Sequence, residues 1–187
     1  MNKVLRLILP LPPSVNSYQR YRVKRIGKRM RVDAYPSQET ESFYEQVLPY
    51  IREEIHKQGW KMPPRDKYVV IKCVFYLHKK GADADNYFKC SVDALEKAGV
   101  VINDSYIIPQ AMDVLVDKDN PHIEMEIIQS EKLGVFSNEE EMEDFKREYC
   151  DKCRRRNKDK CIVFKGLYEN RIHALNEDGS CKEFKGE

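Results

Sequence analysis

Apolar runs of strand length recur along the first 130 residues of the chain. Val4 to Leu9 is one such run and stops at a proline-rich segment, which predicts a buried strand that leaves into an extended loop. Tyr68 to Leu77 is dense in β-branched and aromatic residues and predicts a central strand. Further strands, separated by short polar turns, are predicted at Val100 to Ile102, Ile107 to Val116 and His122 to Ile128.

Two other segments have the hydrophobic spacing of a helix. The first begins at Ser37 and continues up to Gly59, and Pro49 is expected to bend or divide it. The second is expected to be capped by Asp85 and to end at Gly99, with one apolar side and one charged side. Because strands and helices alternate irregularly, the pattern predicts a compact α+β domain rather than a strict βαβ winding.

Basic and apolar residues interleave from Tyr21 to Val32 around a central Gly27, which predicts an exposed basic hairpin. Residues 1–32 hold nine positive charges and no acidic residue. Basic residues at this density, with no acid between them, favour a polyanionic partner over a merely solvated surface. The residues expected to contact DNA are Asn16, Arg20, Arg22, Lys24, Arg25, Lys28, Arg29 and Arg31.

Three polar or aromatic residues beside this basic segment have two interpretations each. Asn16 could contact a DNA backbone, but an ordinary role in a loop explains it equally well. Tyr18 and Tyr21 could stack on bases, although packing on the core is our expectation for both.

The sign of the charge reverses after residue 130, where Glu131 to Glu148 is mainly acidic. We therefore expect a domain over residues 1–130 and a tail over residues 131–187, the tail combining an acidic helical linker with a small cysteine-rich appendage. The 187 residues, 34% charged and 41% hydrophobic, suffice for one substantial core. No apolar run approaches the roughly 20 residues that span a bilayer, so we expect a cytoplasmic protein without a membrane partner.

Four of the six cysteines fall within the last 38 residues. Their spacing is Cys150-x2-Cys153-x7-Cys161-x19-Cys181. A Cys-x2-Cys pair presents two thiolates to one ion, and with no secretion-signal pattern the cluster favours a structural Zn²⁺ site. A redox-labile disulfide and an iron–sulfur cluster would use the same ligands and remain alternatives. Cys73 and Cys90 are expected to be small core residues.

Acidic residues cluster where the central strand gives way to the second helix. Asp83 and Asp85 are two residues apart there, and such carboxylates repel each other unless a cation lies between them. Oxygen ligands of this kind suit Mg²⁺ or Mn²⁺, although a helix cap with a solvated neighbour is the commoner role of Asp-x-Asp. Lys89 follows one turn later and can reach a phosphate oxygen, and Asp93 is expected to orient Lys89.

A longer pattern surrounds these residues. It runs Asp83-x-Asp85-Asn86-x-x-Lys89, then Asp93-Ala94-Leu95, then Gly99 and Asn103-Asp104, and an opening Pro10-x-Pro12-Pro13-Ser14-x-Asn16 precedes it. In this order the pattern resembles the RusA family of Holliday junction resolvases, over roughly residues 3 to 129. The resemblance implies a small α+β domain with a mixed sheet and packed helices that forms a homodimer.

The resemblance also implies paired, metal-dependent nicking of four-way DNA junctions in recombination and repair. Carried over by position, Asp83, Asp85 and Asp104 would hold Mg²⁺, and Lys89 would be a catalytic lysine acting as a base or as a positive charge. A non-enzymatic DNA-binding protein with a zinc-binding tail is the main alternative, and a Mg²⁺-dependent phosphatase is another. Clustered acids oppose bound phosphate and so favour the nuclease over the binding protein, whereas a phosphatase leaves the basic segment unexplained.

Overall fold

The chain forms two compact units. One consists of Met1–Arg65 with Val69–Gln129, and the other of Asp66–Tyr68 with Ser130–Glu187. The structure is a computed structural model, and the residues that it describes are 4–64, 67–154 and 161–186. No helix within those ranges has the length and apolar character needed to cross a membrane.

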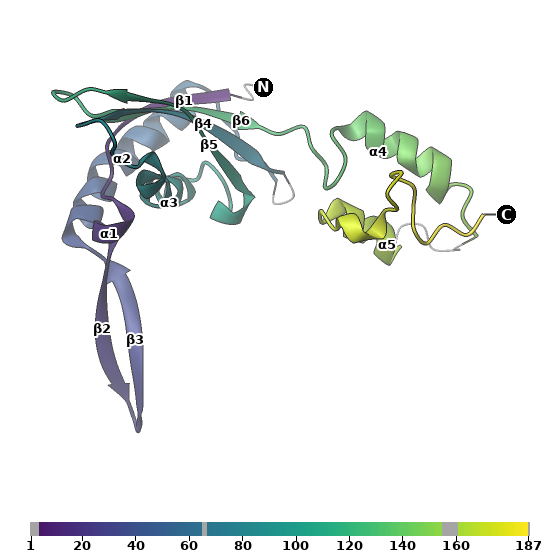
Figure 1. The fold of residues 1–187 in the computed structure, drawn as a ribbon, viewed down its shortest axis with the longest axis horizontal. Helices are drawn as coiled ribbons and strands as arrows, with labels where there is room; N and C mark the ends of the chain where they lie inside the picture. Colours follow the sequence, from purple (N-terminus) through teal and green to yellow (C-terminus); the bar gives the residue numbers. More distant parts are fainter. Residues whose placement is uncertain (1–3, 65–66, 155–160, 187) are drawn as a thin grey trace. The chain divides into compact units, whose positions relative to one another are not determined.

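The first unit combines a sheet, a separate β-hairpin and helices (Figure 1). Its sheet strands are β1 (Val4–Pro10), β4 (Val69–Leu77), β5 (Ile107–Val116) and β6 (His122–Gln129). The hairpin strands are β2 (Gln19–Ile26) and β3 (Arg29–Pro36). The α-helices are α1 (Val15–Tyr18), α2 (Gln38–Lys57) and α3 (Phe88–Ala98), and two 3-10 turns are η1 (Ala84–Tyr87) and η2 (Asp104–Tyr106).

The sheet is mixed, with strand order β1-β6-β4-β5. Strand β6 runs antiparallel to both β1 and β4, whereas β5 runs parallel to β4. Helix α3 lies in the connection between these parallel strands, because parallel neighbours need a crossover. A mixed sheet with packed helices confirms the predicted α+β class.

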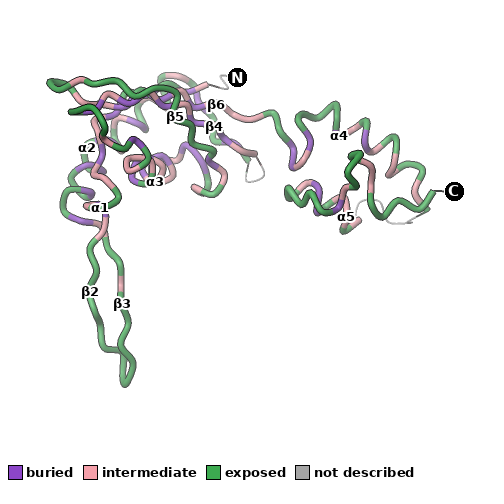
Figure 2. The backbone as a smooth tube through the Cα atoms, viewed as in Figure 1, coloured by how far each residue is buried: buried purple, intermediate pink, exposed green. Residues whose placement is uncertain are grey.

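The core lies between the sheet and the helices α2 and α3, which cover one of its faces (Figure 1). Burial alternates along β4, so that Ile71, Cys73, Phe75 and Leu77 point into the core. Cys90 of α3 is also buried, and the prediction that Cys73 and Cys90 are core residues is confirmed. Figure 2 shows the purple, buried backbone concentrated in these layers.

The predicted first helix is present as α2. Ser37 caps it, because the Ser37 hydroxyl accepts a hydrogen bond from the Thr40 amide at 3.2 Å. Pro49 lies inside the helix without dividing it, which excludes division, one of the two expected effects. Packing of buried side chains such as Val47 and Ile51 on either side of Pro49 stabilises the helix despite the missing amide donor.

The connections on either side of α3 differ from expectation. Asp83, not Asp85, is the capping residue, and it caps the turn η1 that precedes α3. Gly99 ends α3 with a positive φ of 88°, as predicted. Val100 to Ile102 is not a strand: Val100 is buried, and its carbonyl accepts a hydrogen bond from the Trp60 indole at 3.1 Å instead of pairing with a strand.

The second unit is built from short elements. They are α4 (Glu139–Phe145), the π-helical turn η3 (Lys146–Cys150), α5 (Ile162–Tyr168) and the 3-10 turn η5 (Ile172–Ala174). Three glutamates occupy the first turn of α4, where the helix dipole favours negative charge. Its described buried core is small and consists of Leu133, Phe136, Met142, Phe145, Leu167 and Ala174.

Candidate active site and nucleic-acid interface

Asp83 and Asp85 lie on the exposed side of the chain between β4 and α3. Oδ1 of Asp83 accepts a hydrogen bond from the Asp85 amide at 3.1 Å, which fixes the start of the 3-10 turn. Ala84 between them is buried, so the two aspartates share the solvent side. The structure therefore holds one of the two carboxylates in a defined place and leaves both accessible.

Lys89 joins two further carboxylates. Its Nζ lies 2.6 Å from Oδ1 of Asp93, one turn along α3, and 3.2 Å from Oδ2 of Asp104 in η2. These bonds, the one with Asp93 foremost, raise the pKa of Lys89 above its usual value. Asp93 orients Lys89 as predicted, and the side chain of Asp93 is only 13% exposed.

Tyr18 lies beneath this ion-pair network. It is buried as predicted, and its hydroxyl donates to Oδ2 of Asp93 and lies 3.2 Å from the hydroxyl of Tyr44. Burial, followed by the hydrogen bond to Asp93, raises the pKa of Tyr18 to about 12. The sequence contains no signal for this contact, because Tyr18 and Asp93 are 75 residues apart. The other tyrosine expected in the core, Tyr21, is 69% exposed, so that expectation is wrong.

The carboxylates provide suitable donors for a divalent ion. Asp83, Asp85 and Asp104 offer hard oxygen ligands, which Mg²⁺ and Mn²⁺ prefer. Asp104 already faces a cation, the ammonium group of Lys89. As the side chains stand, no three His, Cys, Asp or Glu residues in the described ranges form a group that could hold a metal ion. The donors are of a type that suits the ion, but Asp83, Asp85 and Asp104 do not form a metal-binding group as their side chains stand.

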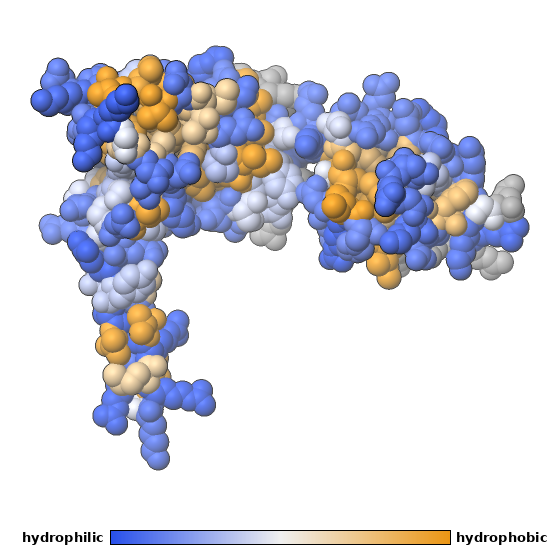
Figure 3. All heavy atoms as spheres, in the orientation of Figure 1, coloured by the Kyte–Doolittle hydropathy of each residue, from blue (hydrophilic) through white to orange (hydrophobic). Residues whose placement is uncertain are grey.

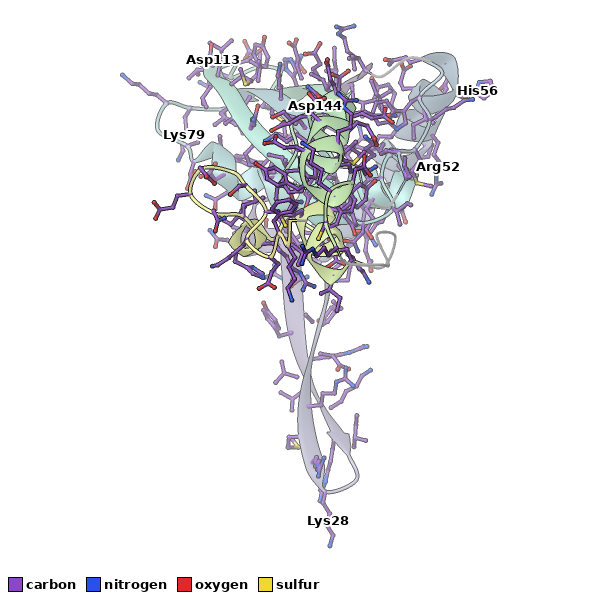
Figure 4. All side chains as sticks on the ribbon, turned by 90° about the vertical axis from the view of Figure 1, so that its right-hand side faces the viewer. Lys28, Arg52, His56, Lys79, Asp113 and Asp144 are labelled. Atoms are coloured by element: carbon purple, nitrogen blue, oxygen red, sulfur yellow. The ribbon has the colours of Figure 1, made fainter. Side chains whose placement is uncertain are left out.

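The predicted basic hairpin is present as a long arm made of β2 and β3. It projects from the first unit, and its backbone is exposed along nearly its whole length (Figures 1 and 2). Gly27 has a φ of 62° at the turn, and Lys28 lies at the tip (Figure 4). An arm with so few buried side chains contributes little to the core and is available to a partner.

The two faces of the arm differ in chemistry. Directly opposed residues of an antiparallel pair share a face, and successive residues alternate between faces. One face is basic and carries the pairs Arg20–Tyr35, Arg22–Asp33, Lys24–Arg31 and Ile26–Arg29. The other face is mainly apolar and carries Tyr21–Ala34, Val23–Val32 and Arg25–Met30. Figure 3 shows the resulting hydrophobic surface along the shaft of the arm.

Side-chain contacts order the basic face. Asp33 accepts from Lys24 at 3.2 Å and from Arg31 at 3.0 Å, which leaves a net positive charge across the three residues. The guanidinium of Arg22 lies 5.3 Å from the ring centroid of Tyr35, in a cation–π arrangement. These contacts hold long side chains on one side of the arm.

A broad groove lies at the root of the arm. It has a volume of about 1020 Å³ and is lined by residues that include Arg20, Tyr35, His78 and Tyr87. Tyr87 ends the turn that carries Asp85, but neither Asp83 nor Asp85 lines the groove itself. Asn16 is exposed on α1, beside this root. The groove is a suitable route for a nucleic-acid strand.

Exposed carboxylates and a basic arm on a small α+β domain are the features expected of an enzyme that acts on nucleic-acid phosphates. Residues 10–128 match the family model of endodeoxyribonuclease RusA. The chain belongs to this family of Holliday junction-resolving endodeoxyribonucleases, which confirms the predicted enzyme class. Nucleases of the family depend on divalent metal ions, bind branched DNA and act as dimers. A search of curated proteins found none that matches this chain.

Proposed function

We propose that this chain resolves four-way DNA junctions by paired, Mg²⁺-dependent nicks. The observation that carries the proposal is the ion pair between Lys89 and Asp104 at 3.2 Å. This ion pair connects η2 to α3. Helix α3 follows directly after the turn η1, which begins at Asp83 and contains Asp85. Carboxylates and an ammonium group in one short region of the fold are the groups that phosphodiester hydrolysis requires.

Asp83, Asp85 and Asp104 are the residues that would hold Mg²⁺, or Mn²⁺ in its place. A divalent ion bound there supplies positive charge where negative charge develops on the phosphate. The carboxylates position that charge, and the exposure of Asp83 and Asp85 leaves room for a phosphate to approach.

Lys89 acts in this proposal as a fixed positive charge. A lysine that donates to two carboxylates is an ammonium ion without a free lone pair, so it is unsuited to accept a proton from water. Its side chain remains 48% exposed and can turn toward a phosphate oxygen. Electrostatic stabilisation of the transition state is therefore the role that we assign to it.

The arm supplies DNA affinity. Its basic face places Arg20, Arg22, Lys24, Arg29 and Arg31 on one side, which suits a run of phosphates. Lys28 at the turn and Arg25 on the other face extend the positive charge around the tip. Asn16, at the root of the arm, would add a short polar contact to the same backbone.

A homodimer would provide one active site for each of the two nicks. We propose that β5 carries the dimer contact, because it exposes apolar side chains at one edge of the sheet: Ile108, Met112, Val114, Leu115 and Val116. The opposite edge, β1, is protected, since Gln58 bonds to both the amide and the carbonyl of Arg6. Pro109 and the Asp113–Val114 hydrogen bond disfavour continuous strand pairing, so the contact would be made by side chains.

Light scattering tests the dimer. Val114→Glu and Val116→Glu should convert a dimer into a monomer at micromolar concentration, because each places a charge in an apolar contact. Ile8→Glu is the matched control, since Ile8 is at least as exposed on the protected edge and the substitution should leave the dimer intact. A monomeric parent protein with full junction-cleaving activity would contradict the proposal.

The activity itself is tested with a synthetic four-way junction and a linear duplex of the same sequence. Each is incubated with the purified protein and Mg²⁺, with and without a chelator. We expect symmetric nicks in the junction, none in the duplex and none with chelator. Binding of the junction without nicking in Mg²⁺ or Mn²⁺ would support a purely DNA-binding protein instead.

A further inference from the structure

The four cysteines of the tail line one small pocket in the second unit. The pocket has a volume of about 30 Å³, and Cys150, Cys153, Cys161 and Cys181 all contribute to its wall. These residues are separated by up to 31 positions in the sequence, and the fold nevertheless brings them to one place. Tyr149 and Phe184 close part of the wall, with their rings edge to face at 5.6 Å.

Local backbone structure positions each of the cysteines. Cys150 ends the turn η3, and the Cys153 amide donates to the Cys150 carbonyl at 3.3 Å, which folds the Cys-x2-Cys segment back on itself. Cys161 is the residue before α5, and its carbonyl accepts from the Lys165 amide at 2.9 Å. Cys181 forms a β-bridge with Leu175. The Cys-x2-Cys turn thus presents two thiols, and the start of α5 and the bridge at Cys181 present one each.

We infer that Cys150, Cys153, Cys161 and Cys181 bind one structural Zn²⁺ ion in a tetrahedral Cys₄ site. Four thiolates are a complete ligand set for structural zinc, and a Cys-x2-Cys turn supplies two of them. No three of the thiols stand in finished metal geometry in the described structure, so the side chains must draw together on binding. All four residues already lie on one pocket wall, so side-chain rotation is the movement that the inference requires.

The same four cysteines could hold an iron–sulfur cluster, and the metal content of the purified protein distinguishes the two.

The small core of the second unit explains why it would use such an ion. Cys150 and Cys181 pack against the described core of this unit, which has only six buried hydrophobic side chains. Units of this size bury little surface and are only marginally stable, so a cross-link adds a substantial share of their stability. An ion held by residues from η3, α5 and the Cys181 bridge would connect the short elements.

Elemental analysis of the full chain, purified without chelator, tests the inference. We expect about one zinc ion per chain, and almost none in Cys153→Ser and in Cys181→Ser. Cys73→Ala is the matched control, because Cys73 is buried in the first unit and its loss should leave the zinc content unchanged. A metal-free parent protein, or one with iron and sulfide, would overturn the inference.

A second experiment covers variants that fail to fold. Cys181→His should retain about one zinc, since imidazole can replace a thiolate as a ligand. Chelator should unfold the second unit while leaving the fluorescence of Trp60, the single tryptophan, unchanged, because Trp60 is buried in the first unit. Cobalt added to the chelated protein should give thiolate charge-transfer absorption. Loss of zinc with no change in circular dichroism, or no cobalt absorption, would count against a structural site.

Discussion

The hydroxyl of Tyr18 donates a hydrogen bond to Asp93, and the same carboxylate holds Lys89 at 2.6 Å through its other oxygen. Tyr18 is also the residue immediately before β2, so it forms the root of the basic arm. Its carbonyl accepts hydrogen bonds from the Ser37 amide at 3.0 Å and the Thr40 hydroxyl at 2.9 Å. Both donors follow β3, the second strand of the arm, in the chain. One buried tyrosine therefore connects the base of the arm to the lysine of the candidate active site.

This connection predicts the effect of Tyr18→Phe. The variant keeps the buried ring but removes the hydrogen bond to Asp93, which loosens the orientation of Lys89. We expect junction nicking to fall about tenfold, equivalent to about 1.4 kcal/mol, while junction affinity stays within about twofold. The measurement is a single-turnover nicking rate alongside a binding titration.

Tyr50→Phe is the control for Tyr18→Phe. The Tyr50 hydroxyl accepts a hydrogen bond from the Ile8 amide at 3.3 Å, away from the acidic residues. Its removal should leave the nicking rate unchanged. If Tyr18→Phe nicked as fast as the parent, or if both variants lost activity equally, Tyr18 would have no specific role in positioning Lys89.

The aspartates predict a separation of cleavage from binding. Asp83→Asn, Asp85→Asn and Asp104→Asn should each reduce nicking about 100-fold or more, because each removes a charge that the metal ion needs. Junction binding should be retained or improved, since less negative charge then opposes the phosphates. Asp144→Asn, at an exposed acid of α4 in the second unit, should nick normally (Figure 4). Retained cleavage by all three site variants would contradict the assignment.

Local patterns predicted most of this fold. The i,i+4 spacing of Lys89 and Asp93 and the cap at Ser37 follow from sequence neighbours, and both are present. The local rule for helix caps does not select Asp83 over Asp85, because both residues satisfy it. The 3-10 turn between Asp83 and α3, in which Ala84 is buried, distinguishes them.

Contacts between distant residues were not predictable in the same way. Val100 to Ile102 has strand composition, but the indole of Trp60, 40 residues earlier, takes the Val100 carbonyl. Only the family resemblance predicts Asp104 as a site residue. Its ion pair with Lys89 depends on how η2 packs beside α3. Hydrophobic periodicity predicts which face of an element is buried, but it does not predict which distant polar group contacts that element.

The ion pairs of Lys89 predict that nicking requires a positive charge at this position and not a base. Lys89→Gln should lower nicking about 100-fold, because it removes the positive charge and leaves Asp93 and Asp104 facing each other. Lys89→Arg should retain activity within about tenfold, since arginine keeps the charge but cannot lose a proton near neutral pH. Equal inactivity of both variants would indicate that lysine acts as a base.

The two faces of the arm predict different effects on salt dependence. Replacing Arg22, Lys24, Lys28 and Arg29 with Ser should weaken junction binding and flatten the plot of log affinity against log salt. Each lost phosphate contact reduces the slope by about 0.9 for B-form DNA. Val23→Ser with Val32→Ser changes the apolar face without changing charge, so its slope should match the parent. An unchanged slope in the fourfold variant would place the arm away from the DNA.

The buried thiol of Cys73 and the buried phenol of Tyr18 predict that the first unit loses stability at alkaline pH. Burial raises the pKa of the Cys73 thiol from 9.0 to about 12, and burial with the Asp93 hydrogen bond raises that of Tyr18 from 10.0 to about 12. The folded state therefore holds these protons more tightly than the unfolded state does. Their stabilising contribution is complete below about pH 9 and is lost as the pH rises toward 12.

Urea unfolding followed by Trp60 fluorescence measures this loss. The unfolding free energy should be nearly flat up to about pH 8 and then decline. Each such group lowers it by about 1.4 kcal/mol per pH unit between the pKa of the group in the unfolded state and its pKa in the folded state. Cys73→Ala removes one group, so its stability is lower at neutral pH but declines less steeply above pH 9. Val47→Ala, a core truncation without a titrating group, should lower the whole curve and keep the parent slope. If Cys73→Ala kept the parent slope as well, the Cys73 thiol would not be a source of the alkaline loss.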